Sequence, residues 1–384
     1  MKTMIALLLV LSMLLCGCGN TAPATEATTE ATTEATTEPT TEPTEAPTEP
    51  APAPTYTNPL NGEVSDTPYT GRIFATTISN VPAALPHVNA GQADIIMEMF
   101  VNSSVVRCLA LFSDISKVGP VGSTRSTRPM FNDIAEHYNA ILSHAGGTNT
   151  ALINANERGI THYNVDSLYR KTDEPLKAGT AYRDKEYKYG EHNLFLLGHG
   201  IADYAEADGQ QLTGLPERDY GMTFAQDGTP YNGEPAHSIT LQMKYQSTKK
   251  ETVMEYNAAL GKYVWWQYGE MMKDQITGQR EMFENVVMMF VPMTTMKHGY
   301  HVADFLQGGV GYYACNGMIV PITWTCAGDK EPFQFLTAEG DPLVFGTGNT
   351  YIAISAPEGS VTWTAPEPQV EETTAETVSE TTAP

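Results

Sequence analysis

Two stretches of this 384-residue chain contain almost no side chains suited to burial, and they limit the part that can fold. Residues 21–55 form a near-repeat of Thr, Glu, Pro and Ala, and residues 366–384 share that composition. Such segments cannot bury enough apolar area to offset the conformational entropy lost on folding. We therefore expect both to be disordered. The first should form an extended acidic stalk, because glutamates repel one another and proline favours extension.

The N-terminus has the pattern of a bacterial lipoprotein signal peptide. Lys2 precedes the apolar run Met4–Leu15, which is too short to cross ~30 Å of hydrocarbon. The run leads into a segment that resembles a lipobox, in which Cys18 follows the small Gly17 whereas Cys16 follows a bulky leucine. Cys18 is therefore the expected lipidation site, carrying diacylglycerol and palmitate-type chains that hold the protein on the extracellular face of the cell membrane.

Charge argues against one class of partner. The chain has 45 Asp and Glu against 22 Lys and Arg, which gives a formal charge of -23. Phosphates would be repelled, so no nucleic-acid partner is expected. Many of the acids lie in the two low-complexity arms, and the body between them is only mildly acidic.

The body changes its hydrophobic pattern near residue 208. Before that point, short apolar runs alternate with helix-length stretches, which favours an α/β layer with a mixed or mostly parallel sheet. From residue 237 onward the pattern consists of short strands and turns, with a hairpin predicted at Asn316-Gly317. The sequence therefore predicts an α+β protein whose N-terminal half is α/β and whose C-terminal half is mostly β.

The same patterns predict the individual elements. In the N-terminal half, strands are predicted at 72–80, 94–101, 105–112 and 140–143, and helices at 129–138 and 149–158. In the C-terminal half, strands are predicted at 237–245, 252–258, 262–267, 285–293, 311–325 and 349–355. The expected segments are a signal peptide (1–17), the lipidated Cys18 with its stalk (18–56), an N-terminal domain (57–207), a junction (208–236), a C-terminal domain (237–358) and an acidic tail (359–384).

Neither the remaining cysteines nor a comparison with known catalytic motifs indicates a reaction. Cys108, Cys315 and Cys326 are odd in number, and the predicted hairpin places Cys315 opposite Met318, so three buried thiols are favoured over a disulfide. GxSxG, HExxH, paired CxxC and Walker-type sequences are missing. The pair His298 and His301 has no third ligand nearby, so neither a metal nor a cofactor is expected.

Arginines before the first predicted helix form the strongest candidate site. Arg125 and Arg128 stand three residues apart, just before Pro129, where helix amides and guanidinium groups together suit a carboxylate or phosphate. The alternative is that they pair with acids such as Asp133 or Glu136.

Two further segments are candidates for the same site. His144, Gly146 and Gly147 follow a predicted strand at the carboxyl edge, where open α/β sheets bind ligands, although a Gly-Gly pair is also a common turn. A charged loop contains the remaining candidates, and its alternative is a solvated surface: Arg183, Asp184, His192 and Asn193.

Three charged residues on predicted strands can be explained without a ligand. Asp94 and Glu98 lie at even spacing on one strand, and Arg107 lies on the next. We interpret them as an ion pair across strands, with ligand binding as the alternative.

Seven short segments occur in the order found in one known family: Gln92–Glu98, Val106-Arg107, Gly119–Val121, Arg125–Pro129, His144–Gly147, Arg183–Lys185 and His192–Leu194. On these segments the chain resembles the YerB-type lipoproteins, bacterial cell-surface proteins with a two-part domain of unknown function. The resemblance covers roughly residues 57–356 and implies the fold, the lipid-anchored location and the candidate site. It departs from the family at Gly122-Ser123-Thr124, which is inserted after Gly-Pro-Val, and it implies no reaction.

Two hypotheses for the function remain. The first is a binding lipoprotein that holds an anionic or carbohydrate cell-envelope ligand, such as a cell-wall polymer, or an envelope protein, in a cleft of the N-terminal domain. The second is an enzyme acting on cell-wall polymer or lipid-linked phosphate, loosely analogous to LytR-CpsA-Psr transferases, with Asp94, Glu98 or His144 as acid or base. Since no nucleophile or metal set is visible, binding is favoured.

Overall fold

The structure is a computed structural model that describes residues 55–66, 71–187, 190–226, 228 and 232–366. The predicted signal peptide, the lipidation site Cys18 and most of both low-complexity arms lie outside these residues. Among the described residues, no helix is long and apolar enough to cross a membrane.

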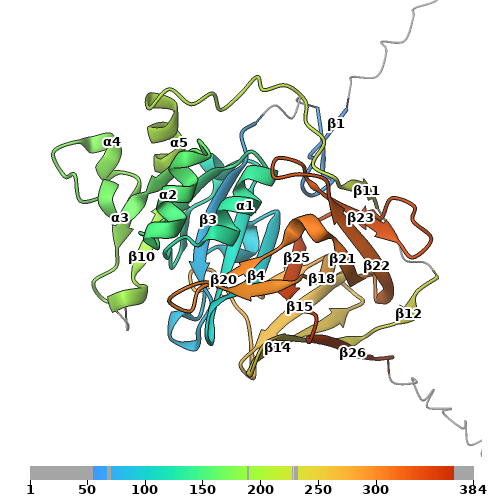
Figure 1. Cartoon of the computed structure of the whole chain (residues 1–384). Helices are drawn as coiled ribbons and strands as arrows, with labels where there is room; N and C mark the ends of the chain where they lie inside the picture. The colour runs from blue at the N-terminus through green and yellow to red at the C-terminus, as the bar shows by residue number, and fades with distance from the viewer. Residues whose placement is uncertain (1–54, 67–70, 188–189, 227, 229–231, 367–384) are drawn as a thin grey trace, which may run out of the picture. The chain divides into compact units, whose positions relative to one another are not determined.

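One mixed sheet contains strands from both halves of the chain (Figure 1). Its order is β12-β22-β21-β18-β25-β4-β5-β3-β7-β8, and β23 pairs with β22. The halves meet where β25 runs parallel to β4, with Tyr351 opposite Ile96. The bounds are β3 Phe74–Ser79, β4 Ile95–Asn102, β5 Val105–Phe112, β7 Ile141–His144, β8 His162–Asn164, β12 Glu234–Pro235, β18 Asn285–Phe290, β21 Gly309–Cys315, β22 Met318–Cys326, β23 Phe333–Thr337 and β25 Thr350–Ser355.

Strand direction gives this sheet a well-defined carboxyl edge. β18, β25 and β4 are parallel to one another, as are β3, β7 and β8, and β5 is antiparallel to both β4 and β3. The six parallel strands therefore end at the same edge, where β5 begins. The predicted α+β class, with a mixed sheet in the N-terminal half, is confirmed.

A second, antiparallel sheet is built from the C-terminal half. It comprises β13 Ser238–Tyr245, β14 Thr248–Asn257, β15 Lys262–Gln267, β16 Glu270–Met271, β17 Met282–Phe283 and β26 Ser360–Thr364. Its last strand corrects the predicted start of the tail at residue 359, because β26 pairs with β13 and its Val361 and Trp363 pack against the core. Exposed and half-buried side chains alternate in β26 over only five residues before the acidic segment, and this pattern is too short to distinguish the strand from the tail in the sequence.

Helices and small strand pairs complete the N-terminal half. α1 Pro129–His137 and α2 Asn149–Glu157 match their predicted ranges closely. The side chain of Thr148 accepts a hydrogen bond from the Ala151 amide and so caps α2. The other elements used below are α3 Val165–Leu168, α4 Pro175–Ala178, α5 Gly198–Ala207, β6 Pro120–Gly122, β9 Ala181–Arg183, β10 Leu194–Leu197, β19 Met293–Thr295 and β20 His301–Ala303.

The large sheet has a hydrophobic core on each face, because side chains alternate along its strands. On β4, Ile95, Met97 and Met99 join the cluster that includes Met130 of α1. Ile96 and Phe100 join the opposite cluster, which includes residues of the second sheet. A polar side chain at an even position of β4 is therefore enclosed between the two sheets.

The cysteine and hairpin predictions are confirmed. β21 and β22 form a hairpin around Asn316-Gly317, with Cys315 opposite Met318. Cys108, Cys315 and Cys326 are buried thiols in the described chain.

Candidate functional site

The arginine segment lies along the carboxyl edge of the large sheet. The Arg125 amide donates to the Thr77 carbonyl (3.0 Å), and the Arg125 carbonyl accepts from the Ala145 amide (2.9 Å). The Thr127 amide donates to the Gly146 carbonyl (3.0 Å). These bonds fix residues 125–128 between β3 and the end of β7, immediately before α1.

Arg107 reaches the same edge from β5, where it lies opposite Ser79, the last residue of β3. Its side chain is only 5% exposed, and its Nη1 donates to the Ser126 carbonyl (2.6 Å). Arg128 is 7% exposed, and its Nη1 donates to the Thr127 carbonyl (2.8 Å). Its guanidinium also lies 5.0 Å from the centre of the Tyr300 ring, which comes from the β19–β20 hairpin. Neither Nε of these two arginines has a hydrogen-bond partner among the described residues.

The three guanidinium groups form a concentration of positive charge. Burial and the charges of Arg128 and Arg125 lower the pKa of Arg107. Within the described parts of the chain, no carboxylate lies within ion-pair distance of Arg107 or Arg128, whereas Arg125 has Glu191 at 3.9 Å. A guanidinium remains protonated in proteins, so these are buried cations without counter-ions, which is energetically costly.

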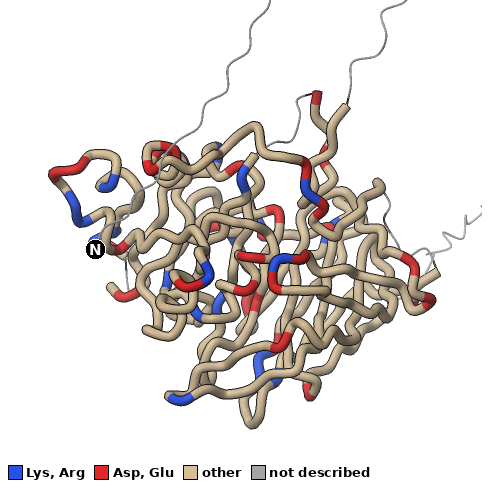
Figure 2. The backbone as a smooth tube through the Cα atoms, turned by 45° about the horizontal axis from the view of Figure 1, so that its top comes forward, with Lys and Arg blue, Asp and Glu red and all other residues tan. Residues whose placement is uncertain are grey.

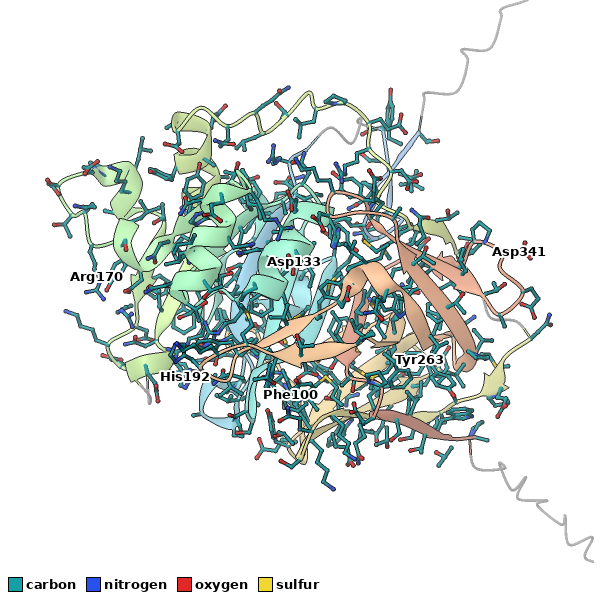
Figure 3. The ribbon with its side chains drawn as sticks, in the orientation of Figure 1. Phe100, Asp133, Arg170, His192, Tyr263 and Asp341 are labelled. Carbon is teal, nitrogen blue, oxygen red and sulfur yellow. The ribbon has the colours of Figure 1, made fainter. Side chains whose placement is uncertain are left out.

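His192 adds a polar group beside the arginines (labelled in Figure 3). Its side chain is nearly buried, and its Nδ1 lacks a partner in the described structure. Burial and the nearby charge of Arg125 lower its pKa. The imidazole is therefore neutral at pH 7 and can serve as a hydrogen-bond donor or acceptor.

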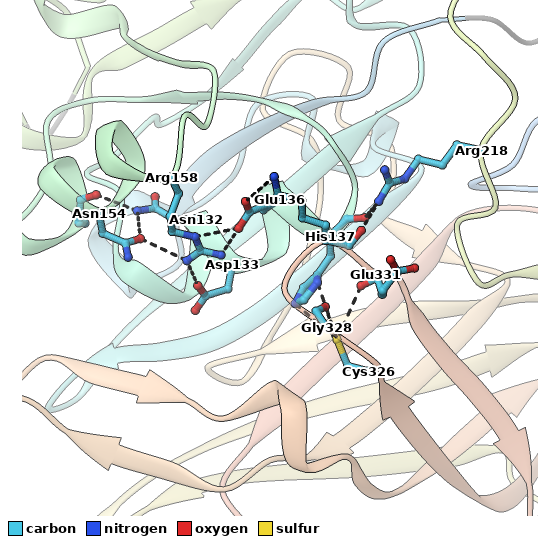
Figure 4. Close-up of polar contacts among 12 residues, drawn as sticks. Asn132, Asp133, Glu136, His137, Asn154, Arg158, Arg218, Cys326, Gly328 and Glu331 are labelled. Atoms are coloured by element: carbon cyan, nitrogen blue, oxygen red, sulfur yellow. Dashed lines mark hydrogen bonds and ion pairs between the residues drawn. The ribbon is translucent and has the colours of Figure 1, made fainter.

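The acids proposed above as partners of Arg125 and Arg128 bind another residue (Figure 4). Arg158, which follows α2, donates through Nε to Glu136 (2.7 Å) and through Nη1 to Asp133. Since both carboxylates are engaged by Arg158, neither is the partner of Arg125 or Arg128, and the acid that Arg125 does approach is Glu191.

His144, Gly146 and Gly147 lie next to residues 125–128 and hold the backbone of that segment in place. Nδ1 of the buried His144 is 2.7 Å from the Gly146 carbonyl, and its Nε2 is 2.9 Å from Nδ1 of His162. Burial and His162 lower the pKa of His144 to about 3, so its ring is neutral. At Gly147, a Cβ would lie 2.9 Å from Cγ2 of Thr127, so only glycine permits this close approach. These residues position the backbone of the site.

Arg183, Asp184 and Asn193 hold the loop that carries His192. Arg183 donates to Asp166 (2.7 Å) and to the Asn193 side chain (2.6 Å). The Asn193 amide group donates to the Asp184 carbonyl (2.8 Å). The guanidinium of Arg183 is thus engaged by Asp166 of α3 and by its own loop. It also lies near Arg125, whose pKa is lowered by burial and by the charge of Arg183, so ligand binding by Arg183 stays a prediction.

The predicted ion pair among Asp94, Glu98 and Arg107 is also wrong. Asp94 precedes β4, at the opposite edge of the sheet, and accepts hydrogen bonds from Asn61 (2.6 Å) and the Ser113 amide (2.6 Å). Glu98 opposes Cys108 rather than Arg107, so its side chain points to the other face of the sheet. There it forms an ion pair with Lys250 of β14 (2.6 Å).

Sequence reasoning missed Lys250, Tyr268 and Tyr300. Lys250 could have been found from the sequence. It lies two positions before Thr252 and four before Met254 on β14, so alternation along the strand predicts that all three side chains face the core. Tyr300 carried none, because its contact with Arg128 depends on a hairpin from the other half of the chain.

No group of three His, Cys, Asp or Glu residues suited to a metal ion occurs in the described structure. His301 packs against the Tyr245 ring (4.3 Å between centres) instead of pairing with His298 around an ion. In Figure 2, acidic and basic residues are distributed along the whole backbone rather than gathered on one side. The arginine cluster is thus a local feature in a protein of negative charge.

Comparisons with known proteins match this chain along most of the described part. The N-terminal domain of a protein of unknown function (DUF3048) matches residues 60–211, and the corresponding C-terminal domain matches residues 241–352. The putative lipoprotein YerB of Bacillus subtilis (strain 168) is 23% identical over 301 residues, which are 77% of this chain and 85% of that protein. The crystal structure of the B. subtilis YerB protein has a TM-score of 0.67 at 21% identity, covering 80% of this chain and 99% of that one.

Proposed function

Because the chain belongs to the YerB-type lipoproteins, the family with the two-part DUF3048 domain, we propose that it is an extracellular, membrane-anchored binding protein whose arginine cluster holds an anionic group of a cell-envelope molecule. The arginine cluster is defined here as Arg107, Arg125 and Arg128, with His192 beside it. The family relationship supports the lipoprotein character, and the cluster supports the ligand chemistry.

The observation that carries the proposal is the burial of Arg107 and Arg128 without a carboxylate partner in the described chain. Burying an unpaired charge is unfavourable, and an anion at this place would remove the penalty. The Nε–H groups of both arginines are buried and unpartnered, and we infer that they would donate to a phosphate or carboxylate admitted beside them, in the planar geometry that guanidinium groups favour.

The different exposure of the three arginines supports a proposal for how a ligand would enter. Arg125 is the most exposed of the three, with 28% of its side chain accessible, so it forms the outer rim. Arg107 and Arg128 lie deeper. A terminal or bridging phosphate could therefore contact Arg125 first and the buried pair afterwards, drawn by a local positive field in an acidic protein.

The enzyme alternative finds less support in the same geometry. Its candidate acids are remote from the cluster, since Asp94 lies at the opposite edge and Glu98 on the opposite face of the sheet. His144 is neutral and hydrogen-bonded on both nitrogens. A cluster of arginines from which the proposed acids Asp94 and Glu98 are remote, with His192 as its one neighbouring imidazole in the described chain, favours binding over catalysis.

The test compares Arg128→Met with wild type in a melting assay with glycerol phosphate. Met replaces the aliphatic stem of the arginine and removes the buried charge, so the variant should melt at or above the wild-type temperature without ligand. Each lost charge-assisted hydrogen bond should remove about 1.5–3 kcal/mol of binding free energy, and ligand stabilisation should vanish. Arg280→Ala, which removes an exposed arginine, is the control and should respond like wild type. A large loss of stability in Arg128→Met without ligand would instead identify the arginine as structural.

A further inference from the structure

We propose that the protein has a second binding site, for a neutral saccharide, in a cleft of about 640 Å³ between the two halves of the chain. Its walls include Val81, Pro82 and Val106 on one side, and Lys250, Trp266 and Tyr268 on the other. Val106 and Arg107 are consecutive on β5 and therefore point to opposite faces of the large sheet. The cleft is thus separate from the arginine cluster.

The base of the cleft carries paired charges. The Nζ of Lys250 lies 2.6 Å from Oε1 of Glu98 and 2.7 Å from Oγ1 of Thr252. Both ionic side chains are almost completely buried. Because the ammonium and the carboxylate neutralise each other, the base presents polar groups without attracting an ion. Of the other charged residues that line the cleft, Lys249 offsets one of the two acids, Glu251 and Glu255, so the lining is close to neutral and slightly acidic. A neutral ligand suits this environment.

Tyr268 has a backbone conformation that its side chain does not favour. It occupies the first position of the two-residue turn between β15 and β16, with φ of 54°, followed by Gly269. Asn is the usual choice at this position, whereas a bulky aromatic residue with positive φ is rare. The ring is 41% exposed, and its hydroxyl donates to the Asn80 carbonyl (2.8 Å), which holds it across the cleft. Strain of this kind is typical of functional positions.

Two polar groups next to Tyr268 lack partners. Nε1 of Trp266 and Oε1 of Gln267 have no hydrogen bond in the described structure, although both residues line the cleft. The first group is a donor and the second an acceptor. Both atoms are buried, so a ligand hydroxyl would have to reach Trp266 or Gln267 from the cleft to satisfy it. The exposed ring of Tyr268 offers an aromatic surface on which the apolar face of a sugar ring can pack. A chain of hydroxylated rings therefore matches the cleft better than an ion or an aliphatic molecule.

The experiment measures binding of triacetylchitotriose and maltotriose by calorimetry. Tyr268→Asn should keep the turn and the melting temperature, because Asn favours positive φ, yet weaken saccharide affinity at least tenfold. Tyr268→Phe should retain most of the affinity. Tyr182→Ala removes a similarly exposed tyrosine outside the cleft and should bind like wild type. Undiminished binding by Tyr268→Asn, or binding of neither saccharide by wild type, overturns the proposal.

A second measurement uses the unmodified sequence and keeps the test valid if Tyr268→Asn does not fold. The indole N–H resonance of Trp266, assigned through Trp266→Phe, should shift when either saccharide is added. That of Trp324, which is buried elsewhere, should not. Inorganic phosphate should leave the Trp266 resonance unchanged, which separates this site from the arginine cluster. A Trp266 resonance that responds to phosphate but to neither saccharide overturns the proposal.

Discussion

Glu98 and Arg107 lie on adjacent antiparallel strands, and their side chains point to opposite faces of the sheet. The register explains this, because Glu98 opposes Cys108 and Arg107 opposes Met99. The carboxylate is consequently enclosed between the two sheets with Lys250, while the guanidinium joins Arg125 and Arg128 on the α1 side.

The buried pair of Glu98 and Lys250 should show strong coupling. Glu98→Gln or Lys250→Met alone should destabilise the protein by about 3–5 kcal/mol, since each leaves a buried charge without its partner. The double variant should be more stable than either single variant. Urea denaturation measures the free energy of unfolding of all four proteins. The exposed pair Lys117 and Asp114 is the control, and Lys117→Ala should change stability by at most about 1 kcal/mol. Additive effects in the double variant would contradict the pairing.

Gly147 should be intolerant of a side chain. In Gly147→Ala the new methyl group would lie 2.9 Å from Thr127 and from Leu152, and would displace the arginine segment from β7. We expect a loss of about 1–3 kcal/mol in unfolding free energy and weaker anion binding. Gly328→Ala is the matched control, because its nearest neighbour is a side-chain atom at 3.7 Å. Calorimetry with glycerol phosphate and urea denaturation report the two effects, and wild-type affinity in Gly147→Ala would count against the arginine site.

Stability should fall at acidic pH partly through His144. Burial lowers its pKa to about 3 in the folded protein, against ~6.5 in the unfolded chain. The neutral form thus stabilises the fold fully above pH ~6.5, and this contribution is lost as pH falls towards the folded pKa. His144→Gln should reduce the slope of unfolding free energy against pH by up to about 1.4 kcal/mol per unit between pH 6 and 4. His199→Gln, at an exposed position, should keep the wild-type slope.

The sequence was most informative where structure depends on nearby residues. α1, α2, β15 and the Asn316-Gly317 hairpin follow from periodicity and turn residues within short windows. The partners of charged residues could not be predicted in this way. Arg158 follows Asp133 by 25 positions, and Lys250 follows Glu98 by 152, so each pairing depends on how the elements pack. Arg125 and Arg128 were identified because they precede a helix, whereas Arg107 was interpreted mainly as the partner of Asp94 or Glu98 in an ion pair across strands.

Truncation should locate the end of the folded unit. A chain that ends at Pro366 retains β26 and should unfold like the full-length protein. A chain that ends at residue 358 lacks Trp363, whose ring lies 5.7 Å from that of Tyr312, and leaves β13 paired on one edge only, with β14. It should lose about 1–3 kcal/mol or more, measured by urea denaturation. Equal stability of the two truncated chains would mean that β26 adds nothing.

Lipidation should depend on Cys18. Cys18→Ser removes the thiol that accepts diacylglycerol, so the protein should leave the membrane fraction or retain its signal peptide. Cys16→Ser should be processed normally. Cell fractionation followed by mass measurement of the N-terminus distinguishes these results, and full membrane retention of a cleaved Cys18→Ser protein would contradict the assignment.

The parallel pairing of β25 with β4 has a consequence for the order of synthesis. β25 ends at Ser355, so the edge of β4 stays open until almost the whole chain has left the ribosome. An open strand edge is a template for association with other chains. The large sheet of the N-terminal half is therefore completed only when the last strands of the chain have been made, so folding of the two halves is coupled.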